Sequence, residues 1–184
     1  MGLFALGHLF YVGVVNPEVL AQRVVLRKGT ERWDWVWLSV FYPVLGSIFL
    51  VAHLDILSGS DLFPQSVRPV GLVLFLLGGG LFLRAMGENP FFEKTVRIQK
   101  ERDHRVIDTG PYRAVRHPGY VGMIAWLLSF PLLLTSAWAF LPVGLAVLCL
   151  VVRTALEDRT LSRKLPGYNA YSARVRARLF PGVW

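Results

Sequence analysis

The sequence predicts an all-α integral membrane protein, a bundle of about five transmembrane helices that ends in a helical hairpin. The first observation behind this class is composition: 54% of the 184 residues are hydrophobic and 17% are charged, against about 25% charged residues in soluble domains. The second is the recurrence of long apolar stretches along the whole chain. The third is the placement of the basic residues, which cluster in alternate connections between those stretches.

The apolar stretches define the candidate spans. They cover residues 1–15, 33–54, 70–86, 120–135 and 138–152. A membrane-spanning helix needs about 20 residues, so the first stretch and the last two are short. We interpret the last two as a tight helical hairpin that turns near Thr135 and Ser136. A single long buried helix is the weaker interpretation, because Pro131 and Pro142 would interrupt it.

The basic residues predict the orientation of the bundle. If five spans alternate, nineteen of the twenty Lys and Arg residues fall on one side, and Arg68 falls on the other. Cytoplasmic connections carry the excess of Lys and Arg, so we expect the N-terminus outside and the C-terminus in the cytoplasm. A four-span arrangement keeps the same cytoplasmic face. We favour a retained first span over a cleaved signal peptide, because no basic segment precedes it.

The net charge of +8 also invites a comparison with nucleic-acid-binding proteins. The basic residues are spread over several connections between apolar runs, however, and the membrane orientation explains them more simply. We therefore expect no nucleic-acid partner. No set of residues has the spacing of a metal site, and the single cysteine excludes an intrachain disulfide.

The polar stretch TGPYRAVRHPGYVG, residues 109–122, lies between two apolar runs. His117 precedes Pro118, which restricts its backbone to extended conformations, and Pro118 can open the fourth helix in its first turn. Arg116, His117 and Tyr120 are therefore expected at a helix N-terminus on the cytoplasmic face, which suits a carboxylate. The alternative is that Arg116 extends to the membrane surface and His117 caps the helix.

A second polar cluster follows the fifth apolar stretch. Arg153 and Glu157 are four residues apart and share one helix face, which in isolation is typical of a surface salt bridge. The hairpin returns the chain to the side of the RHPGY segment, so we expect the two clusters to meet around a small pocket. Such a pocket suits a zwitterionic ligand such as an amino-acid-bearing nucleotide. Glu157 would hold an ammonium group or ribose hydroxyls, and His117 with the helix N-terminus would hold a carboxylate.

Three other segments have two interpretations each. The tail, residues 165–184, is typical of an amphipathic segment on the membrane surface, or it forms a lid that packs Tyr171 and Arg178 over the pocket. The glycines at 78–80 favour close helix packing, or they leave room for a bulky ligand. The tryptophans at 33, 35 and 37 favour an interfacial belt or packing inside the bundle.

The chain resembles the isoprenylcysteine carboxyl methyltransferase family and its phospholipid methyltransferase relatives, which share a GPYRxVRHPxYxG segment, a helical hairpin, an acidic pair and a Y-x2-Y…RLxP-type ending. The matching residues are Gly110 to Arg113, Val115 to Pro118, Tyr120, Gly122, Glu157, Asp158, Tyr168, Tyr171, Arg178, Leu179 and Pro181. The resemblance covers most of the chain and is strongest after Asn89, and residues 16–34 are similar to prokaryotic members. The second acid, Asp158, stands where Glu is common, which leaves its role open.

The resemblance implies an integral membrane methyltransferase that moves a methyl group from S-adenosylmethionine to a lipid-like or prenylated acceptor, in contact with membrane lipid. It implies one domain, residues 1–184, with membrane helices in 1–88 and a cofactor-binding catalytic core with a cytoplasmic pocket in 89–184. The implied membrane is the cytoplasmic membrane of a prokaryote. The acceptor stays open between a prenylated cysteine, a phospholipid amine and a hydrophobic thiol.

The resemblance also implies roles for individual residues. Arg153 would orient an acidic acceptor, and Glu157 would act beside it at the catalytic centre. The implied cofactor-binding residues are Arg116, His117, Pro118, Tyr120, Gly122, Glu157, Tyr171 and Arg178.

Two other functions compete with this one. A nicotinamide-dependent membrane enzyme related to the sterol reductases has a similar C-terminal region, but its larger cofactor would need a longer chain with more spans. A non-catalytic membrane lipid-binding protein would keep a methyltransferase-like pocket without turnover. Stabilisation by S-adenosylhomocysteine, absent with NADPH, distinguishes the methyltransferase from both.

Overall fold

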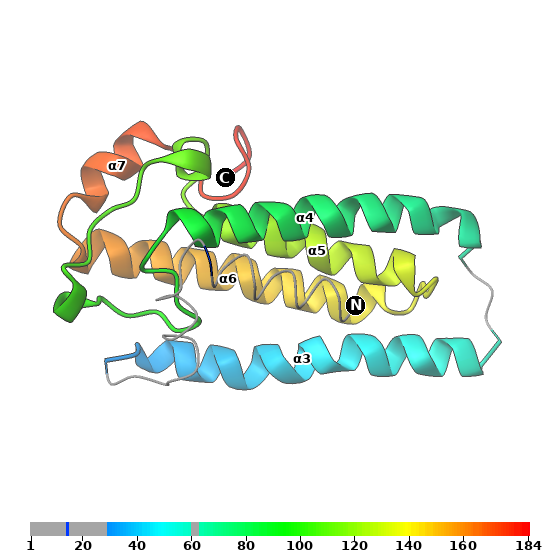
Figure 1. Ribbon diagram of the computed structural model, residues 1–184. Helices are drawn as coiled ribbons and strands as arrows, with labels where there is room; N and C mark the ends of the chain where they lie inside the picture. The colour runs from blue at the N-terminus through cyan, green and yellow to red at the C-terminus, as the bar shows by residue number, and fades with distance from the viewer. Residues whose placement is uncertain (1–13, 15–28, 60–62) are drawn as a thin grey trace.

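The computed structural model describes residues 29–59 and 63–184, together with residue 14. The secondary-structure elements in these ranges are all helices, and the ranges contain no strand. The long helices lie side by side along one axis, as Figure 1 shows, and are α3 (Arg32–Leu57), α4 (Arg68–Glu88), α5 (Pro118–Leu133) and α6 (Phe140–Lys164). Shorter elements connect or cap them: η1 (Gln65–Val67), η2 (Lys100–Arg102), η3 (Gly110–Arg113) and α7 (Tyr168–Arg174). The first predicted span, residues 1–15, lies outside the described residues apart from residue 14.

Helices α3, α4 and α6 are long and apolar enough to cross a membrane, and α5 is a shorter apolar helix of 16 residues. The predicted stretches 33–54 and 70–86 are thus confirmed as single helices. Helix α6 continues beyond the predicted end of the fifth stretch at residue 152 and ends at Lys164. This extension matters for the site, because it carries Arg153 and Glu157 on a continuous helix.

The predicted hairpin is formed by α5 and α6. Thr135 adopts a left-handed conformation with φ of +52°, and the Ser136 N–H donates to the carbonyl of Pro131 at 2.9 Å, so the chain reverses within a few residues. Pro131 lies in the last turn of α5 and Pro142 in the first turn of α6. Pro142 in a first turn costs no helical hydrogen bond, and Pro131 removes one only near the end of α5, so neither residue interrupts the middle of a helix.

Helices α4 and α5 approach each other through glycines. A Cβ added at Gly78 would lie 2.5 Å from the backbone nitrogen of Trp126, and one at Gly122 would lie 2.6 Å from the backbone nitrogen of Phe82. Small residues at such crossings let helix backbones touch. The packing interpretation is therefore confirmed for Gly78. Gly122 faces α4 in this contact.

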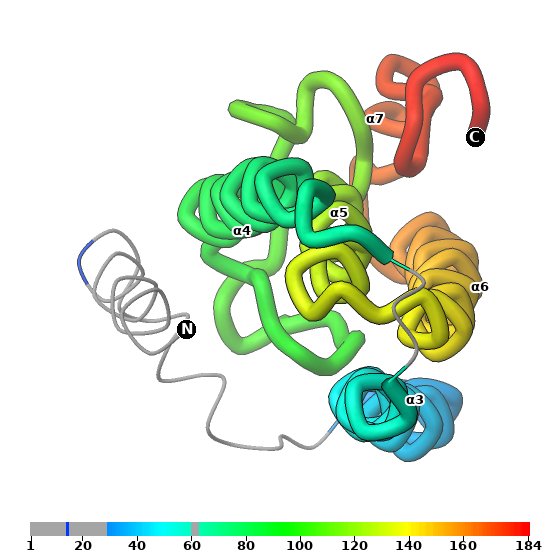
Figure 2. The backbone as a smooth tube through the Cα atoms, turned by 90° about the vertical axis from the view of Figure 1, so that its right-hand side faces the viewer, coloured from blue at the N-terminus to red at the C-terminus, as the bar shows by residue number. Residues whose placement is uncertain are grey.

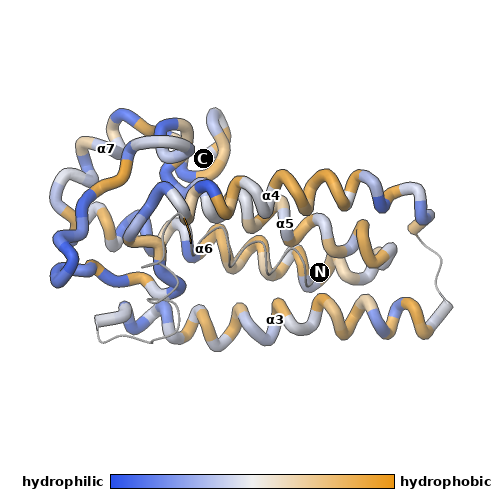
Figure 3. The backbone as a smooth tube through the Cα atoms, viewed as in Figure 1, coloured by the Kyte–Doolittle hydropathy of each residue, from blue (hydrophilic) through white to orange (hydrophobic). Residues whose placement is uncertain are grey.

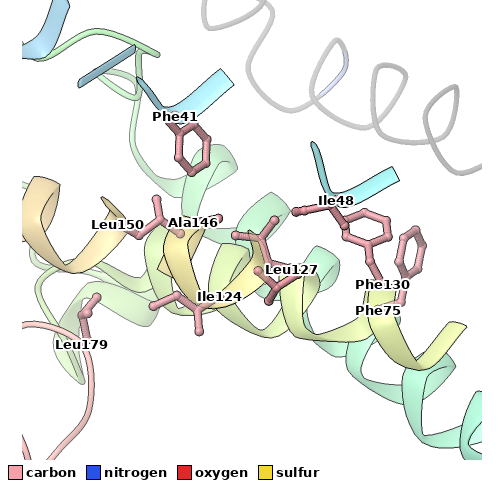
Figure 4. Packing of buried hydrophobic residues seen from close by; sticks show 10 residues of the cluster. Phe41, Ile48, Phe75, Ile124, Leu127, Phe130, Ala146, Leu150 and Leu179 are labelled. Atoms are coloured by element: carbon pink, nitrogen blue, oxygen red, sulfur yellow. The ribbon is translucent and has the colours of Figure 1, made fainter. Parts of the chain in front are cut away.

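The apolar core lies between the four long helices (Figure 4). It contains Phe41 and Ile48 of α3, Phe75 of α4, Ile124, Leu127 and Phe130 of α5, Val143, Ala146 and Leu150 of α6, and Leu179 of the tail. Leu179 is 2% exposed, so the tail is packed into the bundle. The tail therefore does not lie on the membrane surface alone.

The polar segments gather at one end of the bundle. The connection between α4 and α5 (residues 89–117), helix α7 and the tail lie together there, at the end opposite the α5–α6 turn (Figure 1). Figure 2 looks along the bundle and shows α7 and the end of the chain on the side away from α3. Figure 3 shows that hydrophilic residues concentrate at this end, whereas the shafts of the helices are mainly hydrophobic. The fold thus places the predicted polar clusters at the same edge of an apolar bundle.

Candidate functional site

A cavity of about 190 Å³ lies at the polar end of the bundle. Helices α3, α5, α6 and α7 and the α4–α5 connection all contribute to its walls. On the side of the bundle core its lining is apolar, with Trp37, Phe41, Met123 and Leu150. The rest of the lining includes titratable side chains, among them Glu93, His104, Tyr120, Arg153 and Glu157.

Tyr120 joins the two clusters that the hairpin was predicted to bring together. The Arg153 Nε donates a hydrogen bond to the Tyr120 hydroxyl oxygen at 2.8 Å, and the same hydroxyl donates to the Glu157 Oε2 at 2.5 Å. One face of α6 presents Arg153 and Glu157, and the first turn of α5 inserts Tyr120 between them. The three side chains form one continuous hydrogen-bonded row along the cavity.

Arg153 is 3% exposed and is held from several directions. Its Nη1 lies 3.0 Å from the Asp34 Oδ1, and its Nη2 donates to the Lys94 carbonyl at 2.6 Å. The guanidinium lies over the Trp37 ring, 4.0 Å from the centroid, and the Trp37 N–H donates to the Cys149 carbonyl at 2.7 Å. Trp37 therefore packs inside the bundle, and its ring supplies a cation–π contact.

Asp158 is the centre of a second network. Its carboxylate accepts hydrogen bonds from the Arg116 Nε and Nη2 at 2.8 and 3.0 Å, from the Tyr168 hydroxyl at 2.7 Å and from the Arg178 Nε at 3.0 Å. The His117 Nε2 lies 3.4 Å from the same carboxylate. The Arg116 Nη1 donates to backbone carbonyls in residues 172–176. Each guanidinium nitrogen of Arg116 thus has a partner within the protein.

The same network fastens the tail to the RHP segment. The backbone N–H groups of Arg116 and His117 donate to the carbonyls of Ala177 and Arg178, both at 3.0 Å. The Tyr171 hydroxyl donates to the Tyr112 carbonyl at 2.8 Å. These bonds make the tail a fixed wall of the site. They also engage the backbone N–H of His117, the residue that precedes the first turn of α5.

The α4–α5 connection closes the other side of the cavity. Glu93 and Arg97, each with 4% of the side chain exposed, form a two-point ion pair at 2.8 and 2.9 Å, and the hydrogen bond to Glu93 raises the pKa of Arg97. His104 stacks on Phe91 at 4.4 Å between ring centroids, and its Nδ1 accepts the Gln99 N–H at 3.3 Å. Burial lowers the pKa of His104 to about 4, so the imidazole is neutral at pH 7.

The predicted site residues separate into two sets. The cavity is lined by Arg116, His117, Tyr120, Arg153, Glu157 and Tyr171. The other set lies outside the lining: Pro118 opens α5, Gly122 contacts α4, and Arg178 binds Asp158 and lies over the Trp184 ring at 4.7 Å.

Sequence analysis did not identify several residues of the site. Asp34 and Trp37 belong to α3, and a carboxylate within an apolar helix was a usable signal, because buried charge in a membrane protein is rare and usually paired. Gly119 lines the cavity, and a Cβ there would lie 2.7 Å from the Phe92 ring. No local pattern marked His104, whose burial depends on the fold of the whole connection.

Residues 72–163, half of the chain, match the sequence model of the isoprenylcysteine carboxyl methyltransferase (ICMT) family. The chain belongs to this family. The matched residues run from α4 to α6 and include Tyr120, Arg153, Glu157 and Asp158. The family match therefore covers the central residues of both hydrogen-bonded networks, whereas Asp34, Tyr168 and Arg178 lie outside it.

Individual relatives agree with this family. The chain is 34% identical to the probable protein-S-isoprenylcysteine O-methyltransferase of Oryza sativa subsp. indica over 91 residues, which are 46% of this chain and 48% of that protein. It is 31% identical to the protein-S-isoprenylcysteine O-methyltransferase of Saccharomyces cerevisiae over 161 residues, which are 86% of this chain and 64% of that protein. The chain thus spans about half to two thirds of the length of these ICMT-family relatives.

The fold is also similar to a solved structure. The eukaryotic intramembrane Ras methyltransferase ICMT superposes with a TM-score of 0.66 at 20% sequence identity, over 100% of this chain and 64% of the other. The shared fold and the apolar helices make this ICMT-family chain an integral membrane protein. The predicted helical membrane bundle is thereby confirmed.

Proposed function

We propose that this protein is a membrane methyltransferase that takes a methyl group from S-adenosylmethionine and transfers it to the carboxylate of a prenylated cysteine. The observation that carries the proposal is the row of Arg153, Tyr120 and Glu157 along a cavity at the polar edge of a membrane bundle. The family match and the names of the relatives support both the reaction and the acceptor class.

The cavity residues fit the cofactor. Glu157 accepts its hydrogen bond from a neutral hydroxyl, so its charge can serve a cationic ammonium group or ribose hydroxyls. The neutral imidazole of His104 and the aromatic rings of Tyr168 and Tyr171 offer faces for a planar or cationic group. The absence of a side chain at Gly119 makes room for the Phe92 ring, which also lines the cavity. When bound, S-adenosylmethionine supplies a methyl group on a positively charged sulfur.

The acceptor chemistry needs positioning more than acid–base catalysis. A peptide α-carboxylate has a pKa of about 3.5, so it is ionised at neutral pH and attacks without a general base. Arg153 offers guanidinium N–H donors that can orient such a carboxylate. Tyr120 holds Arg153 and Glu157 in fixed relation, so acceptor and donor meet in a defined geometry away from water.

The position of the cavity suits an acceptor with a lipid chain. Its apolar lining includes Phe41 and Met123, and Tyr42 lines it as well while 54% of that residue is exposed on α3. We place the hydrocarbon chain along this apolar lining and the cofactor at the polar end. The basic residues at that end support a cytoplasmic orientation. Because α3 contributes to the cavity, the proposed catalytic domain includes part of residues 1–88 together with residues 89–184.

Ligand binding tests the cofactor. At a concentration about 100-fold above its Kd, S-adenosylhomocysteine should raise the Tm of the detergent-solubilised protein by roughly 5–10 °C. Glu157→Gln should abolish the shift, whereas Glu31→Gln should retain it, because Glu31 pairs with Lys164 outside the cavity. A shift with NADPH alone would favour a reductase, and no shift with either ligand would favour a lipid-binding protein.

Methyl transfer tests the acceptor. Protein in lipid nanodiscs is incubated with methyl-labelled S-adenosylmethionine and, separately, with N-acetyl-S-farnesylcysteine, phosphatidylethanolamine or a long-chain thiol. We expect label in the farnesylcysteine, released by mild base as expected for a methyl ester. Label in the phospholipid or the thiol would replace the proposed carboxylate acceptor with an amine or a sulfur nucleophile.

A further inference from the structure

Asp34 is a fully buried carboxylate in the first turn of α3, with 0% of the residue exposed. Its Oδ2 accepts the Val96 N–H at 2.7 Å, and its Oδ1 lies 3.0 Å from the Arg153 Nη1. Asp34 is not part of the cavity lining, whereas Arg153 is. The carboxylate therefore reaches Arg153 from behind the wall of the site.

The other contacts of Arg153 complete a rigid setting. Its Nε donates to Tyr120, its Nη2 donates to the Lys94 carbonyl, and one face of the guanidinium is covered by Trp37. Among these partners Asp34 supplies the negative charge. The charge of Arg153 is balanced by Asp34, so Arg153 acts on a ligand mainly as an oriented hydrogen-bond donor. Its planar guanidinium cannot turn without breaking several contacts.

Asp34 also connects elements that are distant in the sequence. The Val96 N–H that it accepts belongs to the α4–α5 connection, and the backbone N–H of Glu31 donates back to the Val96 carbonyl at 3.0 Å. The start of α3 is thus bonded to the connection and, through Arg153, to α6. Asp34 thus contacts two other walls of the cavity from α3.

We propose that Asp34 is a positioning residue for Arg153, which fixes the plane of the guanidinium that faces the methyl acceptor. This inference rests on the proposed methyl transfer to a carboxylate. Asp34 acts through Arg153 and touches neither cofactor nor acceptor. It therefore controls acceptor turnover and leaves cofactor binding intact.

The test uses five variants of the full chain in nanodiscs: Asp34→Asn, Asp34→Glu, Arg153→Gln, the double variant Asp34→Asn/Arg153→Gln, and Asp55→Asn as the control. Asparagine keeps the size of Asp34 and removes its charge. Asp55 is a buried acid near the other end of the same helix, where it accepts the Ser136 hydroxyl at 2.5 Å. The readouts are kcat and KM for N-acetyl-S-farnesylcysteine, and the Kd for S-adenosylhomocysteine measured calorimetrically.

We expect Asp34→Asn to lower kcat/KM by about 10- to 100-fold, as misplacement of a reacting group does. The Kd for S-adenosylhomocysteine should change by less than about threefold, because Asp34 lies outside the cavity. Asp55→Asn should match the wild-type protein in both. An equal loss of cofactor affinity in Asp34→Asn would overturn the inference, since a general collapse of the site affects both ligands.

The double variant decides whether Asp34 acts through Arg153. If it does, Asp34→Asn causes no further loss of kcat/KM once Arg153 is glutamine, and Asp34→Glu restores part of the activity of Asp34→Asn. Losses that multiply in the double variant would show that Asp34 acts independently, which contradicts the proposal.

Folding of the single variant does not limit the test. Asp34→Asn leaves a buried guanidinium without its counter-charge, whereas the double variant removes both charges, so the double variant should have the higher Tm. A double variant less stable than both single variants would contradict coupling.

The outcome for the wild-type protein separates this inference from the proposed function. A wild-type protein that neither binds S-adenosylhomocysteine nor transfers methyl groups would refute the proposed function. An active wild type with multiplying losses in the double variant would refute only the role of Asp34.

Discussion

At the residue scale, the buried charged side chains of the site lie in ion pairs. Glu93 pairs with Arg97, Asp34 with Arg153, and Asp158 with Arg116, while the more exposed Arg174–Asp108 pair, with 67% and 44% of the side chains exposed, lies on the surface. Buried pairs are costly to break from one side, whereas exposed pairs contribute little to stability. Single substitutions in the buried pairs should therefore destabilise the protein, whereas substitution of a surface arginine such as Arg174 should change its stability little.

The lowered pKa of His104 predicts how the stability of the fold depends on pH. Its pKa is lowered to about 4 by burial in the folded protein and is about 6.5 in an unfolded chain, so the unfolded state binds the extra proton between these values. Stability should be full above pH 6.5 and should fall as the pH drops through 4, by on the order of 1–3 kcal/mol.

The measurement for this prediction is the apparent Tm in detergent between pH 7.5 and 4. His104→Phe keeps a ring stacked on Phe91 and removes the titrating group, so its Tm should decline less across this range than that of the wild type. His53→Gln, at an exposed position of α3, is the control and should follow the wild-type slope. An unchanged slope in His104→Phe would mean that other groups cause the acid sensitivity.

At the element scale, the contact between α4 and α5 depends on missing side chains. The Gly78 position has backbone atoms of α5 within 3.0 Å of a hypothetical Cβ, whereas Gly80, two residues later on the same helix, has no heavy atom within 4 Å. Backbone atoms cannot move aside as a flexible side chain can. The crossing of these two helices therefore tolerates no side chain at Gly78.

Substituting these two glycines by alanine tests the contact. Gly78→Ala should force the helices apart and destabilise the protein by about 1–3 kcal/mol, which lowers the Tm in detergent by several degrees. Gly80→Ala should be neutral or slightly stabilising, because alanine favours the helix and meets no atom. Equal Tm values for the two variants would contradict a close α4–α5 crossing in solution.

At the scale of the whole molecule, the tail completes the site. Asp158 accepts hydrogen bonds from Arg116, Tyr168 and Arg178. The backbone N–H groups of residues 116 and 117 donate to the carbonyls of residues 177 and 178. Burial raises the pKa of Tyr168, so its hydroxyl remains a neutral donor to Asp158. The end of the chain is thereby fastened to both helices of the hairpin.

Removing the charge of Asp158 should release the tail. In Asp158→Asn, amide hydrogen exchange in residues 175–184 should increase at least about tenfold, because Arg116 and Arg178 lose the carboxylate that they share and the buried Arg116 is left without a counter-charge. Arg174→Gln, which removes a surface pair with Asp108, should leave exchange unchanged. Unchanged tail exchange together with lost S-adenosylhomocysteine binding in Asp158→Asn would indicate a cofactor ligand.

The features of the fold and the site that depend on local or periodic sequence patterns could be predicted from the sequence. The helical bundle, the hairpin turn near Thr135 and the meeting of Tyr120 with Arg153 and Glu157 follow from apolar lengths, prolines and helical spacing. Helical spacing does not show which arginine pairs with which acid. A lid that packs Arg178 over the pocket was one of two interpretations of the tail, and in the structure Arg178 binds Asp158, the acid next to Glu157.

Pairings across the whole chain were also beyond the sequence. Asp34 and Arg153 are 119 positions apart, and no periodic pattern connects them. Their contact requires α3 to pack against α6 with one particular rotation, which depends on the complete core (Figure 4). The same holds for His104, whose environment is created by the fold of the α4–α5 connection.

The separation of Asp34 and Arg153 has a consequence for biosynthesis. Helix α3 leaves the ribosome 119 residues before its partner arginine, which at about 5–20 residues per second means a wait of roughly 6–24 s. During that time the carboxylate has no guanidinium to balance it, and a solitary charge is costly inside a lipid bilayer. We therefore expect the start of α3 to remain near water until α6 arrives, and this helix to reach its final depth late in assembly.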